Sequence, residues 1–255
     1  MTRLWKAEVL VVFALLMILT LVVRAGICAE PGQLNIYVAA GLKKAMDVVV
    51  DKYSKTHGIK VFPNYGPSGG LYTQIIKGQP CDIYFSADFS LIEKLEQKQL
   101  LAQKKKFLKD FMVLVVSKTG EKKIHSFDDL TKDGVVLSIA DPRAPVGLYA
   151  ERGLRKLGLF EKIVAKGNLK AKPSTVNQLA ILVQEDQVDA GLIFQSVANM
   201  YGLPYVASMG NDLTGEIVFG IAVMKGPNEA DAKKFMDFTI KQIGAFVAYG
   251  WQPYE

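Results

Sequence analysis

The feature that most constrains the fold is an alternation of short apolar runs with segments of helical periodicity. The strand-like runs occupy residues 34–39, 59–62, 82–86, 111–116, 135–139 and 190–194. Between them, apolar residues recur every three or four positions, as in Leu42, Met46, Val49 and Tyr53. Strands that alternate with helices predict parallel sheets covered by helices on both faces. We therefore predict an α/β fold.

Two long β-rich runs interrupt the alternation. They are "FMVLVVSK" over 111–118 and "EIVFGIAVMK" over 216–225. If both cross between sheets, residues 115–217 form a second lobe inserted into a first lobe made of 30–114 and 218–255. We expect each lobe to be a mostly parallel sheet flanked by helices. A ligand cleft between the lobes follows, because such folds bind ligands at domain interfaces and at the carboxyl ends of strands.

The N-terminus has the pattern of a secretory signal. Arg3 and Lys6 precede an apolar run over 9–23, and small residues follow up to Ala29. That run is shorter than the roughly 18–20 residues needed to span a bilayer, so a signal anchor is the less favoured reading. The residue before Cys28 is Ile27, which fits lipid attachment poorly. We predict a signal peptide over 1–29 and a soluble product in the periplasm.

Charge and side-chain chemistry disfavour nucleic-acid binding and catalysis. Loss of Arg3, Lys6, Arg24 and Glu8 with the signal lowers the net charge from +6 to +4, too little for a clustered basic face. The only histidines lie in apparent surface connections, and no nucleophile has a base beside it in sequence. Metal-ligand spacing is absent from the sequence. We expect no enzyme, no cofactor, no direct protein ligand to a metal and no nucleic-acid partner.

Four helix openings rich in small residues indicate an anion site. "AAG" at 39–41 and "SGG" at 68–70 open helices in the first lobe, and "DPRAPV" at 141–146 and "STV" at 174–176 do so in the second. Helix N-termini present unsatisfied N–H groups, and glycine lets a ligand approach the backbone. Each opening could instead be a routine cap, and Ser68 in particular could be an ordinary N-cap. Taken together, the four favour an oxyanion held by neutral donors.

These segments resemble the periplasmic molybdate-binding proteins of ABC transporters, within the type II periplasmic binding protein fold. The resemblance runs from about Leu34 to Gly250 and rests on the following segments, which occur in family order: "YVAAGLKKAM", "SGGLYTQIIKGQPCDIYFSAD", "ADPRAPVGLYAERGLRKLG", "STVNQLAILVQ" and "DAGLIFQSVA". It implies capture of a tetrahedral oxyanion, molybdate or tungstate, by closure of the lobes. Delivery to an ABC permease and its ATPase is also implied, and we expect the receptor to be a monomer.

The resemblance also implies a set of oxyanion-binding positions. In the family the anion is held by two serines, two backbone N–H groups and a tyrosine hydroxyl. The corresponding positions here are Gly41, Ser68, Val146, Val176 and Phe194. Two of the three hydroxyls are therefore absent, since glycine replaces the first serine and phenylalanine replaces the tyrosine. Possible additional contacts are Gly69, Arg143, Tyr149, Asn177 and Gln195. The alternative is that this fold binds a different anion, such as a phosphonate-like solute or an organic carboxylate.

Overall fold

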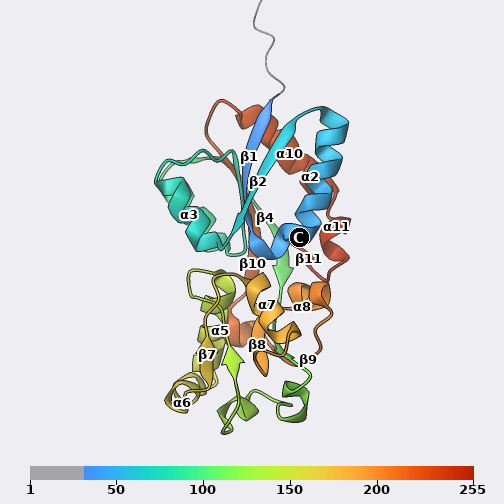
Figure 1. Cartoon of the computed structure of the whole chain (residues 1–255). Helices are drawn as coiled ribbons and strands as arrows, with labels where there is room; N and C mark the ends of the chain where they lie inside the picture. Colours follow the sequence, from blue (N-terminus) through green and yellow to red (C-terminus); the bar gives the residue numbers. More distant parts are fainter. Residues whose placement is uncertain (1–31) are drawn as a thin grey trace, which may run out of the picture. The chain divides into compact units, whose positions relative to one another are not determined.

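Two separate β-sheets organise the chain in the computed structural model, which describes residues 32–255 (Figure 1). The strand order is β11-β4-β10-β3-β1-β2 in the first sheet and β7-β6-β8-β5-β9 in the second. The predicted signal peptide, residues 1–29, lies outside the described residues. Over the part of the chain that is described, no helix has the length and apolar character needed to cross a membrane.

The first lobe is built around the six-stranded sheet. Its strands are β1 (Gln33–Ala39), β2 (Lys60–Gly66), β3 (Ile83–Ser86), β4 (Leu101–Asp110), β10 (Ile217–Met224) and β11 (Gln252–Pro253). Its helices are the 3₁₀ turn η1 (Ala40–Leu42), α2 (Lys43–His57), α3 (Ser68–Ile76), α4 (Phe89–Gln97), α10 (Glu229–Lys241) and α11 (Gly244–Val247).

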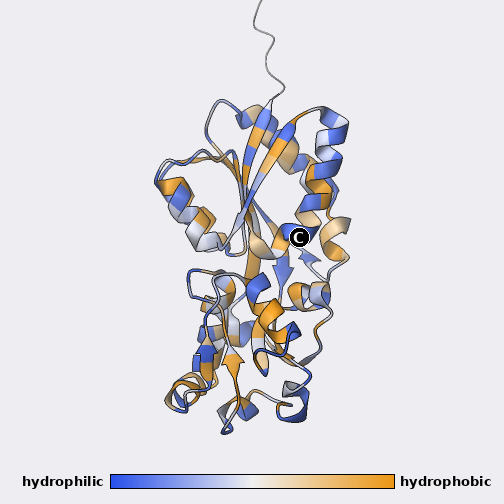
Figure 2. Cartoon of the chain, viewed as in Figure 1, coloured by the Kyte–Doolittle hydropathy of each residue, from blue (hydrophilic) through white to orange (hydrophobic). Residues whose placement is uncertain are grey.

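Apolar residues on both faces of this sheet explain the helical layers. In β1, Leu34, Ile36 and Val38 belong to the core shared with α2 and α10, whereas Tyr37 belongs to a smaller core shared with α3 and α4. Side chains alternate between the faces of a strand, so one strand can feed both cores. The helices are amphipathic, as the mixed colouring of α2 in Figure 2 illustrates.

The second lobe is built around the five-stranded sheet. Its strands are β5 (Met112–Val116), β6 (Leu137–Ser138), β7 (Leu169–Ala171), β8 (Ala190–Phe194) and β9 (Tyr205–Met209). Its helices are α5 (Pro145–Lys156), α6 (Phe160–Ala165), α7 (Val176–Gln184), α8 (Gln195–Tyr201) and α9 (Asn211–Thr214), with short 3₁₀ turns η2 (Gly120–Lys122) and η3 (Asp128–Thr131).

The two-lobed α/β class is confirmed, but the prediction of mostly parallel sheets is wrong. In the first sheet β1 runs parallel to β2 and β3, whereas β10 is antiparallel to both β3 and β4. In the second, β6 is parallel to β7 and β8, whereas β5 is antiparallel to β8 and β9. Both sheets are mixed because β5 enters the second sheet from the first lobe, and β10 enters the first sheet from the second lobe. Each of these strands runs antiparallel to both of its neighbours.

Strand membership also shifts the predicted lobe boundaries. The boundary at 114/115 falls inside β5, all of which pairs in the second sheet, and the boundary at 217/218 falls one residue inside β10. The run 111–118 does not contribute to both sheets. The chain leaves the first sheet at Asp110, the last residue of β4, before this run begins. We assign the two crossings to Phe111 and to the segment between Met209 and Ile217.

The parallel strands determine where loops converge. In β1 and β2 the last pair in register is Ala39 with Gly66, and β3 ends beside them at Ser86. The carboxyl ends of these three strands therefore share one edge of the first sheet. The carboxyl ends of β6, β7 and β8 share an edge of the second sheet in the same way. The loops that follow these six strands supply most of the site described next.

Candidate functional site

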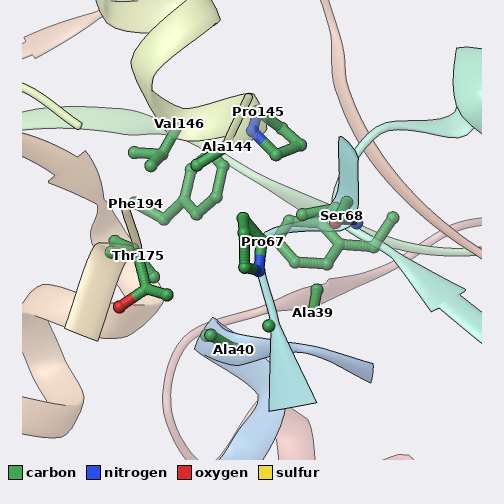
Figure 3. A pocket seen from close by; sticks show the side chains of 14 residues that line it. Ala39, Ala40, Pro67, Ser68, Ala144, Pro145, Val146, Thr175 and Phe194 are labelled. Atoms are coloured by element: carbon green, nitrogen blue, oxygen red, sulfur yellow. Dashed lines mark hydrogen bonds between the residues drawn. The ribbon is translucent and has the colours of Figure 1, made fainter. Parts of the chain in front are cut away.

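A small cavity lies where the loops of the two lobes meet (Figure 3). Its volume is about 20 Å³, counted as the space open to the centre of a water-sized sphere. The lining residues are Ala39, Ala40, Gly41, Gly66, Pro67, Ser68, Ala87, Ala144, Pro145, Val146, Thr175, Val176, Phe194 and Phe219. None of them is charged, and only Ser68 and Thr175 carry a polar side chain. All four predicted helix openings reach this cavity.

Ser68 is the first residue of α3 and is not its N-cap. The cap position is Pro67, which has no side-chain cap hydrogen bond, so the reading of Ser68 as an ordinary cap is wrong. Ser68 is 1% exposed, and its Oγ accepts a hydrogen bond from the Ala87 N–H at 3.1 Å. Its backbone carbonyl accepts from the Tyr84 hydroxyl at 2.8 Å. These two contacts fix the serine in place and leave its hydroxyl hydrogen available to a ligand.

Val146 lies in the first turn of α5, directly after Pro145. A first-turn N–H has no carbonyl partner inside its own helix, and proline suits the preceding position because it has no N–H to lose. Gly147 lets the start of α5 lie close to the backbone of Ala140, which follows β6. A Cβ at Gly147 would lie 2.2 Å from the Ala140 carbonyl oxygen. The "APVG" sequence therefore brings the start of α5, with Val146, to the cavity wall.

Val176 opens α7 in a comparable way. Thr175 forms a capping box in which its Oγ1 accepts from the Gln178 N–H at 3.2 Å, and the Gln178 side chain accepts from the Thr175 N–H at 3.2 Å. The cap holds the threonine hydroxyl at the helix end, and Figure 3 shows its oxygen pointing away from Phe194 and Pro67. Of the two lining hydroxyls, only that of Ser68 is not used as a helix cap.

Gly41 and Phe194 also line the cavity, at the two positions where a hydroxyl is missing. A Cβ at Gly41 would meet Val176 Cγ1 at 3.3 Å and Val197 Cγ2 at 3.4 Å, which is tight but not blocked. Phe194 is 2% exposed, and its ring packs edge-on against Phe219 at 5.3 Å between centroids. This wall of the cavity is therefore apolar.

The five possible additional contacts do not line the cavity. Two are exposed or point elsewhere: the Arg143 guanidinium pairs with Asp141 (Nε to Oδ1, 2.8 Å), and Gln195 Nε2 donates to the Tyr205 hydroxyl at 3.3 Å. The hydrogen bond from the Arg143 guanidinium lowers the pKa of the Asp141 carboxyl. The direction of Gln195 depends on Tyr205, which the fold brings close, whereas the partner of Arg143 lies only two residues away in sequence.

Tyr149 faces a neighbouring groove instead. It lines that groove together with Asp88 and Arg152, and its ring lies 6.3 Å from that of Phe194. Burial raises the pKa of the Tyr149 hydroxyl, and the Asp88 carboxylate raises it further.

The remaining two residues, Gly69 and Asn177, each donate a hydrogen bond to the opposite lobe. The Gly69 N–H donates to the Arg143 carbonyl at 3.1 Å, and Asn177 Nδ2 donates to the Ala40 carbonyl at 2.8 Å.

The sequence analysis did not single out Ala87 or Phe219 as lining residues. Ala87 directly follows β3, so its position after a predicted strand could have indicated it. Phe219 lies within β10, and its approach to the cavity depends on the antiparallel pairing of β10 with β3, which sequence did not predict. Among residues 32–255, no group of three metal-ligating side chains is clustered closely enough to hold a metal ion.

The geometry defines a class of protein: two α/β lobes that enclose a small, uncharged cavity between loops and helix N-termini. The chain belongs to the family of bacterial extracellular solute-binding proteins, whose model matches residues 34–252. Members of this family bind a solute and are not enzymes, as expected from the sequence.

Comparison with individual proteins narrows the relationship. The chain is 28% identical over 229 residues to the molybdate-binding protein ModA of Escherichia coli, covering 86% of this chain and 88% of ModA. It is 30% identical to a domain assigned to a molybdenum ABC transporter of Clostridium difficile (TM-score 0.66, 88% of this chain and 99% of that one).

Two more distant structures share the fold. The periplasmic molybdate-binding protein of Azotobacter vinelandii has a TM-score of 0.76 at 21% identity, covering 87% of this chain and all of that one. The sulfate-binding protein SubI of Mycobacterium tuberculosis has a TM-score of 0.71 at 15% identity, covering 88% of each chain. The relatives and structures together support a relationship to ModA.

Proposed function

We propose that this chain is an exported receptor that captures a small tetrahedral oxyanion, molybdate or tungstate, and delivers it to an ABC permease powered by an ATPase. The observation that carries the proposal is the cavity itself. All five oxyanion-binding positions expected from the resemblance, Gly41, Ser68, Val146, Val176 and Phe194, line this one cavity.

The chemistry of the lining supports an anion. The N-termini of α3, α5 and α7 meet there, and each contributes first-turn N–H groups and the positive end of a helix dipole. Desolvating an oxyanion is costly and must be offset by several charge-assisted hydrogen bonds, each worth roughly 1.5–3 kcal/mol. Backbone N–H groups and the Ser68 hydroxyl can provide them without a charged side chain.

The mechanism is closure of the two lobes on the ligand. Ser68 and the Gly41 loop come from the first lobe, whereas Val146, Val176 and Phe194 come from the second. Neither lobe alone presents a complete set of donors. The anion therefore stabilises the closed state by bridging groups from both lobes.

The second candidate is a receptor of the same fold for a different anion, and the apolar wall favours it. Without the two family hydroxyls, affinity for molybdate should fall by roughly ten- to a hundredfold per lost donor. The size of the cavity favours the first candidate, because a cavity with only about 20 Å³ open to the centre of a water-sized sphere leaves little space for an organic substituent beside the anionic group. Such a space suits a compact ion better than one with an organic substituent.

Isothermal titration tests the proposal directly. Residues 30–255 are titrated with molybdate, tungstate, sulfate and phosphate at fixed pH and salt. We expect one site that prefers molybdate or tungstate over the other two anions. Absence of binding to all four, or preference for sulfate or phosphate, would reject molybdate or tungstate as the ligand and direct the search to other anions.

A further inference from the structure

Two hydrogen bonds join the lobes directly beside the cavity. On one side, the N–H of Gly69 in α3 donates to the backbone carbonyl of Arg143 at 3.1 Å. On the other, Nδ2 of Asn177 in α7 donates to the backbone carbonyl of Ala40 at 2.8 Å. Each of the four residues is adjacent in sequence to a residue that lines the cavity. Closing these contacts and assembling the cavity are therefore one event.

Gly69 permits a backbone-to-backbone contact that a side chain would obstruct. A Cβ at this position would lie 2.5 Å from the Arg143 carbonyl oxygen, well inside the closest approach that real Cβ atoms show. The Arg143 carbonyl belongs to the backbone of the opposite lobe, so it cannot move aside as the end of a flexible side chain could. Any other residue at position 69 must therefore either break the hydrogen bond or move the lobes apart.

The neighbouring glycine provides a contrast. A Cβ at Gly70 would meet only the Pro67 ring of its own lobe, at 3.2 Å, with no other heavy atom within 4 Å. Both glycines lie in the first turn of α3. A substitution at Gly70 therefore changes the same helix without touching the other lobe.

Asn177 has a defined orientation at its contact. Its Nδ2 faces the Ala40 carbonyl, and turning the amide over would place Oδ1 against that oxygen instead. In the observed orientation, Oδ1 is buried and has no hydrogen-bond partner. A buried acceptor without a partner costs free energy, so the Asn177 side chain holds this orientation although it is unfavourable for Oδ1. The contact across the lobes accounts for that arrangement.

We infer that Gly69 and Asn177 are positioning residues that latch the lobes in the closed state and so set the affinity of the receptor. They act through lobe geometry and do not contact the ligand. The latches join uncharged groups, so they favour closure before any ligand binds. Since apparent affinity falls with the fraction of protein in the binding-competent state, losing a latch weakens binding. This inference rests on the proposed function only in taking the closed state as the one that holds the anion.

The test compares Gly69→Ala with the matched control Gly70→Ala in residues 30–255. Small-angle scattering without ligand measures how closed each variant is, and titration with molybdate or tungstate measures its affinity. We expect Gly69→Ala to have the larger radius of gyration and a dissociation constant raised about tenfold or more, mainly through faster release. Its unfolding midpoint without anion should match that of the control, since alanine is a good helix former.

Asn177→Ala provides a second, independent variant and should change scattering and affinity in the same direction. Equal scattering curves for Gly69→Ala and Gly70→Ala would overturn the latch, whether or not any anion binds. If none of the anions binds but the curves differ, the latch stands and the proposed ligand is wrong. If the anions bind and Gly69→Ala binds as tightly as the control, the latch is likewise overturned.

Discussion

Ser68 combines two roles in the proposed site. As an acceptor it holds the Ala87 N–H at 3.1 Å, which ties the start of α3 to the loop after β3. In the proposal, its hydroxyl also donates a hydrogen bond to the ligand. Both roles follow from its place as the first residue of α3, where the helix does not use the side chain as a cap.

Replacing Ser68 with alanine should therefore weaken binding strongly and folding mildly. We expect the dissociation constant for the bound anion to rise roughly ten- to a hundredfold, the worth of one charge-assisted hydrogen bond. The free energy of unfolding should fall by about 1 kcal/mol because the Ala87 N–H loses its acceptor. Titration calorimetry and urea unfolding measure the two effects. The exposed Ser90 provides the control Ser90→Ala, and equal affinity in the two variants would exclude Ser68 as a ligand.

Individual residues also show how far sequence could predict this site. Gly41, Ser68, Val146, Val176 and Phe194 all line one cavity, because each lies at the end of a strand or the start of a helix. Their role in binding an anion stays a prediction. The direction of a long side chain depends on the partner that it finds in the fold: Gln195 contacts Tyr205 and Tyr149 lines the groove with Asp88, whereas Arg143 pairs with the nearby Asp141. Their roles could not be predicted for that reason.

At the scale of elements, the sequence analysis missed β4, β7, β9 and β11, and β4 shows one physical reason. β4 contains Lys104, Lys105 and Lys106 in succession, so it lacks a strand-like apolar pattern. It pairs with β10 and β11 in antiparallel fashion, and the Lys106 ammonium lies over the Phe89 and Tyr254 rings. Lysine stems can cover apolar surface while the charge stays in water, which explains how such a strand forms.

The end of β4 also carries a buried carboxyl at the crossing between lobes. Asp110 is 2% exposed, and its Oδ1 accepts from the Phe111 N–H at 2.8 Å and from the Ser196 N–H of α8 at 3.3 Å. The Ser196 hydroxyl donates to Oδ2. Burial raises the pKa of Asp110 from 3.8 to about 7, although these hydrogen bonds act in the opposite direction. The carboxyl thus links a strand of one lobe to a helix of the other.

Stability should depend on pH through this group. Because the pKa is higher in the folded state, folded protein binds the Asp110 proton more tightly than unfolded protein between pH 4 and 7. The resulting stabilisation is complete below about pH 4 and is lost as pH rises to about 7. Urea unfolding of the wild type and of Asp110→Asn at several pH values measures it. We expect the difference between the two to shrink or reverse as pH rises; a difference independent of pH would contradict the assignment.

At the scale of the whole molecule, the order of elements brings the two halves of the site together. The chain leaves the first sheet after β4, builds the second lobe and returns through β10, so the carboxyl ends of β1, β2 and β3 can meet those of β6, β7 and β8. The sequence analysis expected this exchange from two long β-rich runs, and in the structure these runs are β5 and β10, the first strands after each crossing. It did not predict that the crossing strands would make both sheets mixed.

The central claim is that an oxyanion binds between the lobes at the cavity beside Ser68. Crystals of residues 30–255 grown with molybdate, with diffraction recorded at the molybdenum absorption edge, test it most directly. We expect one strong anomalous peak inside the cavity, within hydrogen-bonding reach of the Ser68 hydroxyl and the first turns of α5 and α7. A peak confined to surface lysines, or an empty cavity in protein saturated with molybdate, would contradict the claim.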